Sequence, residues 1–501
     1  MVIHLLKVER GPAVRTPKSV TVLGAGVAGL VAAYELERLG HRVEVLEGSR
    51  RIGGRVYTHR FGDGPGSPYA ELGAMRFPMT HTHMQHYMAE LGLLGEIRQF
   101  RTLFSDDDNL LFLAGGRHIR VREAPDVLVA RLDAQLGEHG YRHNTLLFGA
   151  WLNTCLNAIA PREFADWPRV STGLLGLVDR IDLEPYLCGT TRSRFDLRSV
   201  VAHHPHIRSV AFRGHERLLD DVLDETSHAL CRMRGGMDAF TNRLAQKISA
   251  PMRLGHEVVG LSVRDGGVLV GVRHGGTITY RHCDYVLCTI PFPILRTLTL
   301  EGFDDDKLNV IHETRYWPAT KIALHCREPF WAADGITGGA SFTGGLVRQT
   351  YYPPVDSDPS LGAVLLASYT IGPDADALDK LGEATRHRVI MDEVGRMHPG
   401  LREPGMILGS VSHAWGAHRW SKGAAAIRWG QDTATRQEQQ RAAARPQGQL
   451  FFAGEHCSSK PAWIEGAIES ALDAIHDIEM SELGSTTSQI DWPILRAERR
   501  Q

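Results

Sequence analysis

The sequence predicts an α/β protein organised around a Rossmann-type nucleotide-binding domain, and three observations support this prediction. A short apolar run at 20–23 is followed by a glycine-rich turn, a helical pattern and a second apolar run at 43–46. Further strand patterns lie at 256–290 and 320–370. Residues 120–227, between these groups, have mostly helical periodicity. At 501 residues the chain exceeds the size of one ordinary core, so we expect two or three domains.

The first strand, Val20–Leu23, is rich in β-branched residues, as is typical of a buried parallel strand. The turn after it has GxGxxG spacing, in which the first glycine permits a tight bend and the second lets the backbone approach a pyrophosphate. The third glycine lets helix and strand pack closely. An acid ends the second strand, roughly 20 residues on, where ribose hydroxyls are bound. We therefore predict a dinucleotide site that includes Gly24, Gly26, Ala28, Gly29 and Glu47.

A second glycine pair follows that acid, in the segment Arg51-Ile52-Gly53-Gly54-Arg55. It resembles the pair that flavoproteins of the amine-oxidase type have at this place and that NAD-dependent dehydrogenases usually lack. The resemblance implies FAD as the cofactor, with Gly54 and Arg55 in contact with it. The segment 420–423 lacks the cysteine that some of these flavoproteins use for covalent attachment, so we expect non-covalent FAD.

The segment ELGAMRFP at 71–78 makes the resemblance specific, because it is similar to a segment of the L-amino-acid oxidase family. The family's arginine there binds the substrate carboxylate, and Arg76 is the matching residue. A planar guanidinium can hold a carboxylate through two parallel hydrogen bonds. The resemblance also implies that Met75 and Arg76 contact the cofactor. The alternative is that Arg76 merely pairs with a nearby acid.

Lys321 lies in the apolar pattern ATKIALHC, where a lysine normally points to solvent because a buried ammonium is unfavourable. In the resembled family the matching lysine faces the flavin and assists the reaction with oxygen, so Lys321 is our candidate catalytic residue. Tyr369 matches a tyrosine that joins the arginine at the carboxylate. Its alternative role is that of an ordinary strand aromatic.

The resemblance supplies the remaining site residues. A helix should begin near Ile464, with its positive N-terminal end toward the flavin. In the family, the positions of Glu455 and Ile464 contact FAD, and the position of Val258 contacts the adenine. Trp463 lies beside the substrate, and the carbonyl of Ala462 meets the substrate amine. No metal site is expected, since His203-His204-Pro205-His206 lacks partner cysteines or acids at ligand spacing.

The resemblance and the breaks in pattern divide the chain into segments. Residues 120–227 form a helical insertion that in the family covers the substrate, with helical patterns at 124–136 and 218–230. We expect a glutathione-reductase-like FAD domain from 18–68, 228–290 and 439–480, and a mixed-sheet substrate domain from 69–119 and 291–438. Residues 1–17 should be a loose arm and 481–501 a peripheral tail.

Composition limits the kinds of binding partner and the location that we expect for the protein. A formal net charge of −2 gives no reason to expect nucleic acid as a partner. The sequence contains no run of about 18 apolar residues, so we expect no membrane span. The seven cysteines form no CxxC pair, and the N-terminus lacks a signal-peptide core. We therefore expect a cytoplasmic protein, and a homodimer or larger homo-oligomer.

The resemblance to the L-amino-acid oxidase family implies FAD-dependent oxidation of L-α-amino acids by molecular oxygen to 2-oxo acids, ammonia and hydrogen peroxide. Trp463 and Trp420 favour large apolar or aromatic side chains. Three alternatives stay open: a monoamine or polyamine oxidase, an amino-acid 2-monooxygenase, and a non-catalytic FAD-binding subunit. The segment 420–423 offers no clear second aromatic wall of the kind that amine oxidases use.

Overall fold

The structure is a computed structural model. The expected N-terminal arm up to residue 16 and the tail beyond 481 lie outside the residues it describes. Those are 17–64, 66–102, 106–113, 117–159, 170–192, 194–226, 229–356 and 358–481.

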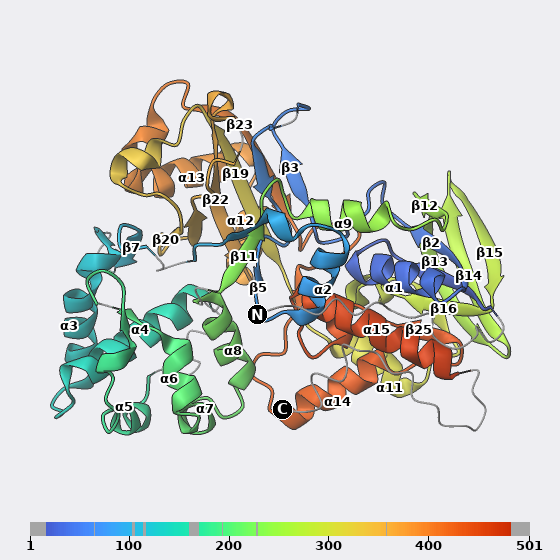
Figure 1. Cartoon of the computed structure of the whole chain (residues 1–501), viewed down its shortest axis with the longest axis horizontal. Helices are drawn as coiled ribbons and strands as arrows, with labels where there is room; N and C mark the ends of the chain where they lie inside the picture. Colours follow the sequence, from blue (N-terminus) through green and yellow to red (C-terminus); the bar gives the residue numbers. More distant parts are fainter. Residues whose placement is uncertain are drawn as a thin grey trace.

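Three regions make up the molecule (Figure 1). The nucleotide-binding region, on the right, contains the helices α1 (Val27–Arg38) and α15 (Ile464–Met480). A second sheet stands at the upper left, with β19 (Ala319–Cys326) and β22 (Ala363–Ile371) at its centre. A group of helices, the helical insertion, lies at the lower left.

The nucleotide-binding region is built on a five-stranded parallel sheet. Because the carboxyl ends of parallel strands meet at one edge, the segments that follow these strands converge there. α1 and α15 pack against each other, and their apolar residues share one core with the sheet. The predicted strand–turn–helix–strand is confirmed. The strand order is β12 (Met252–Leu254), β2 (Arg42–Glu47), β1 (Ser19–Leu23), β16 (Tyr285–Cys288) and β25 (Leu450–Phe452).

A mostly antiparallel sheet packs beside the parallel one, with glycine turns between its antiparallel strands and one parallel strand pair at its end. It consists of β15 (Thr277–Cys283), β14 (Gly267–His274), β13 (Glu257–Arg264) and β17 (Thr299–Glu301). The helices α10 (Phe292–Leu295), α11 (Asp305–Glu313) and α14 (Thr433–Ala444) contribute to the same core.

The second region is a seven-stranded mixed sheet in which the predicted strands at 320–326, 348–352 and 363–370 are confirmed. Ile322 and Leu324 of β19 face the core under α13 (Glu383–Met397), whereas Ala323 faces the helical insertion. Lys321 shares the face of Ala323, because side chains alternate along a strand. The order is β23 (Ile407–Ala414), β19, β22, β21 (Gln349–Tyr351), β20 (Ala340–Phe342), β7 (Leu110–Leu113) and β8 (Arg117–Arg120).

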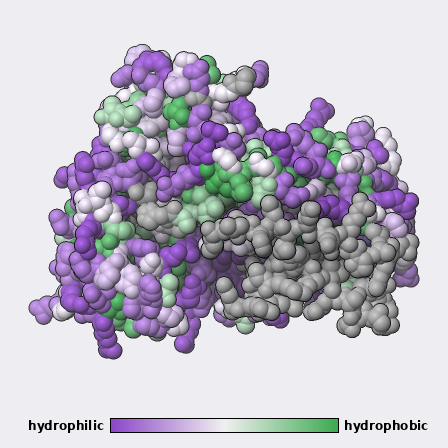
Figure 2. All heavy atoms as spheres, viewed as in Figure 1, coloured by the Kyte–Doolittle hydropathy of each residue, from purple (hydrophilic) through white to green (hydrophobic). Residues whose placement is uncertain are grey.

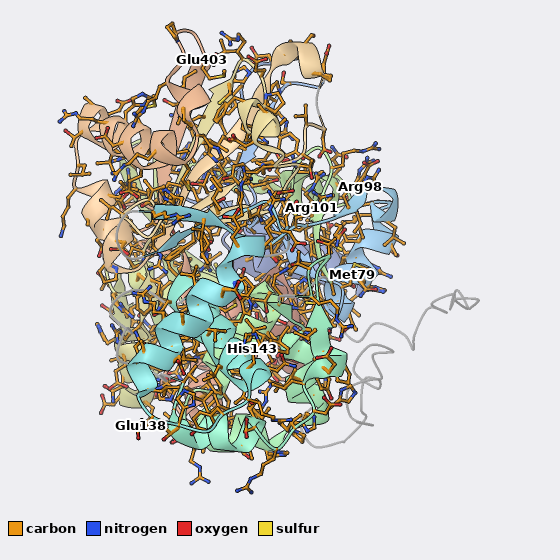
Figure 3. The ribbon with its side chains drawn as sticks, turned by 90° about the vertical axis from the view of Figure 1, so that its left-hand side faces the viewer. Met79, Arg98, Arg101, Glu138, His143 and Glu403 are labelled. Atoms are coloured by element: carbon orange, nitrogen blue, oxygen red, sulfur yellow. The ribbon has the colours of Figure 1, made fainter. Side chains whose placement is uncertain are left out.

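The helical insertion packs against the Ala323 face of the mixed sheet. Figure 3 views it from outside, with Glu138 and His143 marking the connection between its first two helices. Its helices are α3 (Ala124–Leu136), α4 (His143–Ile159), α5 (Thr172–Val178), α6 (Leu197–His203), α7 (His206–Ala211) and α8 (Glu216–Glu225), with a hairpin of β9 (Leu187–Cys188) and β10 (Arg194–Phe195).

One predicted helix of the insertion is correct and one is too long. The pattern at 124–136 matches α3, but the pattern at 218–230 ends early, because α8 stops at Glu225. Leu230 instead begins β11 (Leu230–Met233), which pairs with β5 (Phe77–Pro78) and β6 (Ile97–Gln99). The apolar spacing of this short segment suits a helix or a strand, and pairing with two strands distant in the sequence makes it a strand.

The remaining elements connect the regions. α2 (Thr82–Glu90) packs on α15, and α9 (Asp238–Ala245) packs on α1. A hairpin of β3 (Thr58–Arg60) and β4 (Tyr69–Glu71) reaches the mixed sheet, and β18 (Tyr316–Trp317) pairs with β24 (Ala425–Ala426). The domain boundaries stay predictions.

The surface seen in Figure 2 is largely hydrophilic, with small hydrophobic groups between polar ones. Among the described residues, no helix combines the length and the apolar content needed to cross a bilayer. The same residues contain no cluster of three or more histidines, cysteines or acids placed to hold a metal ion.

Candidate functional site

A cavity of about 460 Å³ runs along the carboxyl edge of the parallel sheet. It reaches from the glycine turn, past the start of α15, to β19 and β22. Three of the predicted site residues do not line it: Gly29, Met75 and Arg76. The predicted residues that do are Gly24, Gly26, Ala28, Glu47, Gly54, Arg55, Val258, Lys321, Tyr369, Glu455, Ala462, Trp463 and Ile464.

The glycine turn leaves open space where a phosphate group could lie. A Cβ on Gly26 would have a single neighbour within 4 Å, the Cα of Gly54 at 3.8 Å, and α1 begins there without a side-chain cap. The N–H groups at this helix end can therefore receive an anion. At Gly29, by contrast, a Cβ would lie 1.9 Å from the carbonyl oxygen of Gly24. Gly29 thus serves close packing rather than contact with the cavity.

Glu47 is fixed by the backbone at the end of β2. Its carboxylate accepts hydrogen bonds from the N–H of Ala25 at 2.8 Å and of Ser49 at 2.7 Å. A carboxylate has about four acceptor positions, so two remain for hydroxyl groups in the cavity. Trp420 packs on Gly48, where a Cβ would lie 2.4 Å from the indole ring. The indole of Trp420 therefore lies against the residue after Glu47, and its part in side-chain selection stays a prediction.

Glu455 joins three segments in the middle of the cavity. Its carboxylate accepts hydrogen bonds from Arg55 Nη1 at 2.6 Å, from the N–H of Ala462 at 2.9 Å and from the N–H of Ala426 at 3.2 Å. Burial alone would lower the pKa of Arg55, but this carboxylate raises it. Arg55 is therefore a fixed cation. Charge-assisted hydrogen bonds of this kind hold both side chains in one geometry.

Lys321 is buried, so the solvent-facing alternative for this residue is wrong. Its Nζ donates to the carbonyl oxygens of Gly73 at 2.7 Å and Glu71 at 3.3 Å, and lies 4.8 Å from the ring centre of Tyr369. Burial, followed by the positive charge of Arg76, lowers the pKa of Lys321 to about 7. The ammonium can thus exchange its proton near neutral pH.

Arg76 lies between β4 and β5, buried in a ring of aromatic side chains. Its Nη1 donates to the hydroxyl of Tyr351 at 2.9 Å, and its Nη2 forms an ion pair with Glu225 at the end of α8. The guanidinium carbon lies 5.2 Å from the ring centre of Phe100, 5.5 Å from that of Tyr351 and 6.0 Å from that of Tyr369. Burial alone would lower the pKa of Arg76, but the Glu225 carboxylate raises it overall.

Tyr369 stands between the two buried cations, since its ring faces both Lys321 and Arg76. Burial raises the pKa of its hydroxyl, which stays protonated. Arg76 donates its hydrogen bond to the hydroxyl of a different tyrosine, Tyr351, and the role of Tyr369 at the carboxylate stays a prediction. Tyr369 lines the cavity and Tyr351 does not.

At the start of α15, Ala462 has φ +71°, a left-handed backbone conformation that favours glycine. Trp463 follows as the residue before the helix, and α15 begins at Ile464 as predicted. A second large aromatic, Trp415, also lines the cavity and donates its indole N–H to the carbonyl oxygen of Leu72 at 2.7 Å.

Glu225, Tyr351 and Trp415 lie at Arg76 or in the cavity lining without having been predicted from the sequence. Glu225 lies within the predicted helical stretch, with nothing local to distinguish it from the other acids of α8. Tyr351 lies in a Tyr-Tyr-Pro-Pro segment, and its aromatic type and its place in a strand pattern resemble those of Tyr369. Trp415 lies five residues before the segment 420–423, where the sequence offers no clear second aromatic wall.

Similarity to known proteins decides the family. The family model for flavin containing amine oxidoreductases matches residues 27–478. The chain belongs to this family. It is a flavin-dependent oxidoreductase with FAD as its cofactor, and the predicted fold class and resemblance are confirmed.

Individual relatives refine the comparison. The flavin-dependent L-tryptophan oxidase RebO of Lentzea aerocolonigenes is 54% identical over 470 residues, covering 93% of this chain and 99% of that protein. An L-amino-acid oxidase of Siganus canaliculatus is 28% identical over 481 residues, covering 94% of this chain and 87% of that one. A putrescine oxidase structure with bound putrescine has a TM-score of 0.62 at 18% identity, covering 93% of this chain and 99% of that one. At that identity the likeness shows the fold alone.

The cavity fits FAD by its chemistry. The open space over Gly26 and the free helix end suit a diphosphate, and the two remaining acceptor positions of Glu47 suit ribose hydroxyls. Val258 lines the cavity on β13, and Arg55 with Glu455 lies toward its middle. The contact that each residue makes stays a prediction.

Proposed function

We propose that this enzyme oxidises L-α-amino acids with large aromatic side chains, L-tryptophan among them, to 2-oxo acids with release of ammonia and hydrogen peroxide. The observation that carries the proposal is Arg76, a buried cation ringed by aromatic side chains next to the cavity wall. The full-length similarity to a flavin-dependent L-tryptophan oxidase supports the choice of substrate.

FAD, when bound, supplies the hydride acceptor and returns the electrons to oxygen. The chain's own residues position the substrate and supply a proton. Arg76 binds the α-carboxylate through parallel N–H donors, and Tyr351 holds Nη1 in place. The carbonyl of Ala462, next to Trp463 in the cavity lining, accepts from the substrate amine. Holding a reactant in one orientation can contribute several kcal/mol, roughly 7–11 at best, to lowering the barrier.

Lys321 is the residue that we assign to the oxygen step. Its Nζ lies on the cavity wall and carries a proton near neutral pH, so it can stabilise negative charge on reduced oxygen and donate that proton. The carbonyl oxygens of Gly73 and Glu71 hold Nζ, and the nearby Glu71 carboxylate favours its charged form.

The test is peroxide and ammonia formation by the FAD-loaded enzyme with each L-amino acid, with D-enantiomers and tryptamine as controls. We expect L-tryptophan and other large aromatic substrates to react fastest, and tryptamine, which lacks the carboxylate, to react poorly. An amide with carbon dioxide as the main products would indicate a 2-monooxygenase. Preference for tryptamine would indicate an amine oxidase. No peroxide from any substrate would leave a non-catalytic FAD-binding subunit.

Other parts of the proposal concern the protein as a whole. We propose non-covalent FAD, a homodimer or larger homo-oligomer, a cytoplasmic location, and no nucleic-acid or membrane partner. Acid precipitation should release all of the flavin into the supernatant, and light scattering of the holoenzyme should give at least twice the mass of one chain, 55.4 kDa.

A further inference from the structure

The acids of α8 differ in where they find their partners. Asp220, Asp221 and Asp224 form ion pairs with arginines of the helical insertion, namely Arg208, Arg217 and Arg198, and Asp221 also accepts a hydrogen bond from Trp429. Glu225, the last residue of α8, reaches out of the insertion to Arg76. A carboxylate at a helix C-terminus is unfavourable for the helix itself, because that end has partial negative charge. Glu225 therefore serves Arg76 rather than α8.

The pairing blocks the role that Arg76 has in the proposed function. Arg76 is buried, and an unpaired guanidinium there would be strongly unfavourable, so the free enzyme needs a counter-ion. Glu225 supplies it through Nη2, while Nη1 is held by Tyr351. A substrate carboxylate and Glu225 cannot both occupy Nη2 without placing two negative charges side by side. One of them has to leave.

Glu225 has a route by which to leave. Its side chain is 20% exposed, whereas that of Arg76 is 7% exposed, so the carboxylate can turn toward water while the guanidinium stays buried. The exchange replaces one carboxylate by another. The net charge around Arg76 and the neighbouring Lys321 is therefore the same before and after it.

We propose that Glu225 is a specificity-determining residue that occupies the carboxylate subsite at Arg76 and is displaced by the α-carboxylate of the substrate. This proposal rests on the proposed function and deepens it. Only a ligand with its own carboxylate can replace Glu225 without leaving Arg76 unpaired. Amines without that group meet a site that is already neutral, so Glu225 favours amino acids over amines.

The test measures carboxylate binding to the FAD-loaded enzyme without turnover. The probe is indole-3-propionate, which has the side chain and carboxylate of tryptophan but no amine to oxidise, and its primary amide is the uncharged control. Isothermal titration should show that Glu225→Gln binds indole-3-propionate about tenfold more tightly than wild type. The amide should bind both proteins equally. Glu225→Ala should give the same tightening if the glutamine variant folds poorly.

Asp224→Asn is the matched control, since Asp224 neighbours Glu225 on α8, its side chain is 19% exposed, and it pairs with an arginine of the insertion. This variant should bind the probe as wild type does. For turnover, Glu225→Gln should lower KM for L-tryptophan about tenfold and change kcat less than twofold. Indole-3-propionate should also raise the melting temperature of Glu225→Gln more than that of wild type, because it restores the missing counter-ion.

Unchanged or weaker probe binding in both Glu225 variants would overturn the exchange, and would make Glu225 a permanent support of Arg76. This outcome differs from failure of the proposed function. If wild type oxidises amino acids but the variants bind the probe no more tightly, only the exchange is refuted. If wild type oxidises none while the variants bind it more tightly, the exchange stands and the proposed function fails.

Discussion

The two ends of the cavity are built in different ways. At the nucleotide end, backbone groups do most of the work: Gly26 leaves space for an anion, and two N–H groups fix the carboxylate of Glu47. At the other end, which we propose takes the substrate, side chains do this: Arg76 lies next to Tyr369 of the cavity wall and is held by the Tyr351 hydroxyl and the Glu225 carboxylate. We therefore expect the nucleotide end to be disrupted by substitutions that add volume. We expect the other end to be disrupted by substitutions that remove a single charge.

The largest expected effect is at the substrate end. Arg76→Ala should lower kcat/KM for L-tryptophan by roughly 30- to 5,000-fold, about 2–5 kcal/mol, because it removes the carboxylate partner and leaves Glu225 without a cation. FAD content should stay at one per chain, since the nucleotide end is untouched. Steady-state kinetics with flavin absorbance checks both.

Arg194→Ala is the control for that change. Arg194 is also buried and paired with an acid, Asp107, but it lies in the insertion, away from the cavity lining. It should destabilise the protein and leave kcat/KM of the folded enzyme within about twofold. Equal losses of kcat/KM in both variants would remove the special role of Arg76.

Lys321→Met should slow the oxygen-dependent half-reaction by about 10²-fold while amino-acid-dependent flavin reduction changes little, because the lost group acts on reduced oxygen. Stopped-flow measurements separate the two half-reactions. Lys307→Met is the matched control: Lys307 is equally buried and donates to the carbonyl oxygens of Ala442 and Ala443, but does not line the cavity. An unaltered oxygen step in Lys321→Met would refute the assignment.

The same lysine predicts a pH dependence. Because the pKa of Lys321 is lowered to about 7, the ammonium form predominates below pH 7 and is lost above it. The rate constant for the oxygen step should therefore fall as pH rises through about 7, by up to about tenfold per unit. In Lys321→Met this dependence should disappear. A wild-type profile that is flat between pH 6 and 9 would contradict the proton-donor role.

At the nucleotide end, an added methyl group tests how closely α1 packs on the glycine turn. Gly29→Ala would place a methyl group 1.9 Å from the carbonyl oxygen of Gly24, so α1 must move. We expect a loss of about 1–3 kcal/mol in stability, together with weaker FAD binding. Gly176→Ala in α5 is the matched control, since a Cβ there meets nothing within 4 Å. It should stabilise by about 0.5–1 kcal/mol. Normal flavin content and stability in Gly29→Ala would contradict the packing argument.

The same contrast explains what the sequence could predict. The nucleotide end follows from local spacing, because Gly24, Gly29 and Glu47 lie in one strand–turn–helix–strand. The substrate end joins distant segments, such as Arg76 and Tyr351, which are 275 residues apart. A family resemblance located Arg76 and Lys321, but it did not reveal the acid that neutralises Arg76. That pairing depends on where α8 ends, which the periodicity at 218–230 misplaced.

Ala462 lies where the two ends meet, and its variant should have the smallest effect. Its N–H donates to Glu455, and φ is +71°, where a Cβ is unfavourable by about 1–2 kcal/mol. Glycine removes that strain but gives the unfolded chain more conformational freedom. Ala462→Gly should therefore stabilise the folded protein by a net value of roughly 0.5–1 kcal/mol.

Activity distinguishes backbone from side chain at this position. If only the carbonyl of Ala462 meets the substrate amine, kcat/KM should change less than about twofold in the glycine variant, because the carbonyl is retained. Ala474→Gly within α15 should have the opposite effect on stability, a loss of about 1 kcal/mol, since glycine is unfavourable in a helix interior. A large fall in kcat/KM for Ala462→Gly would mean that the methyl group, and not the backbone alone, shapes the substrate site.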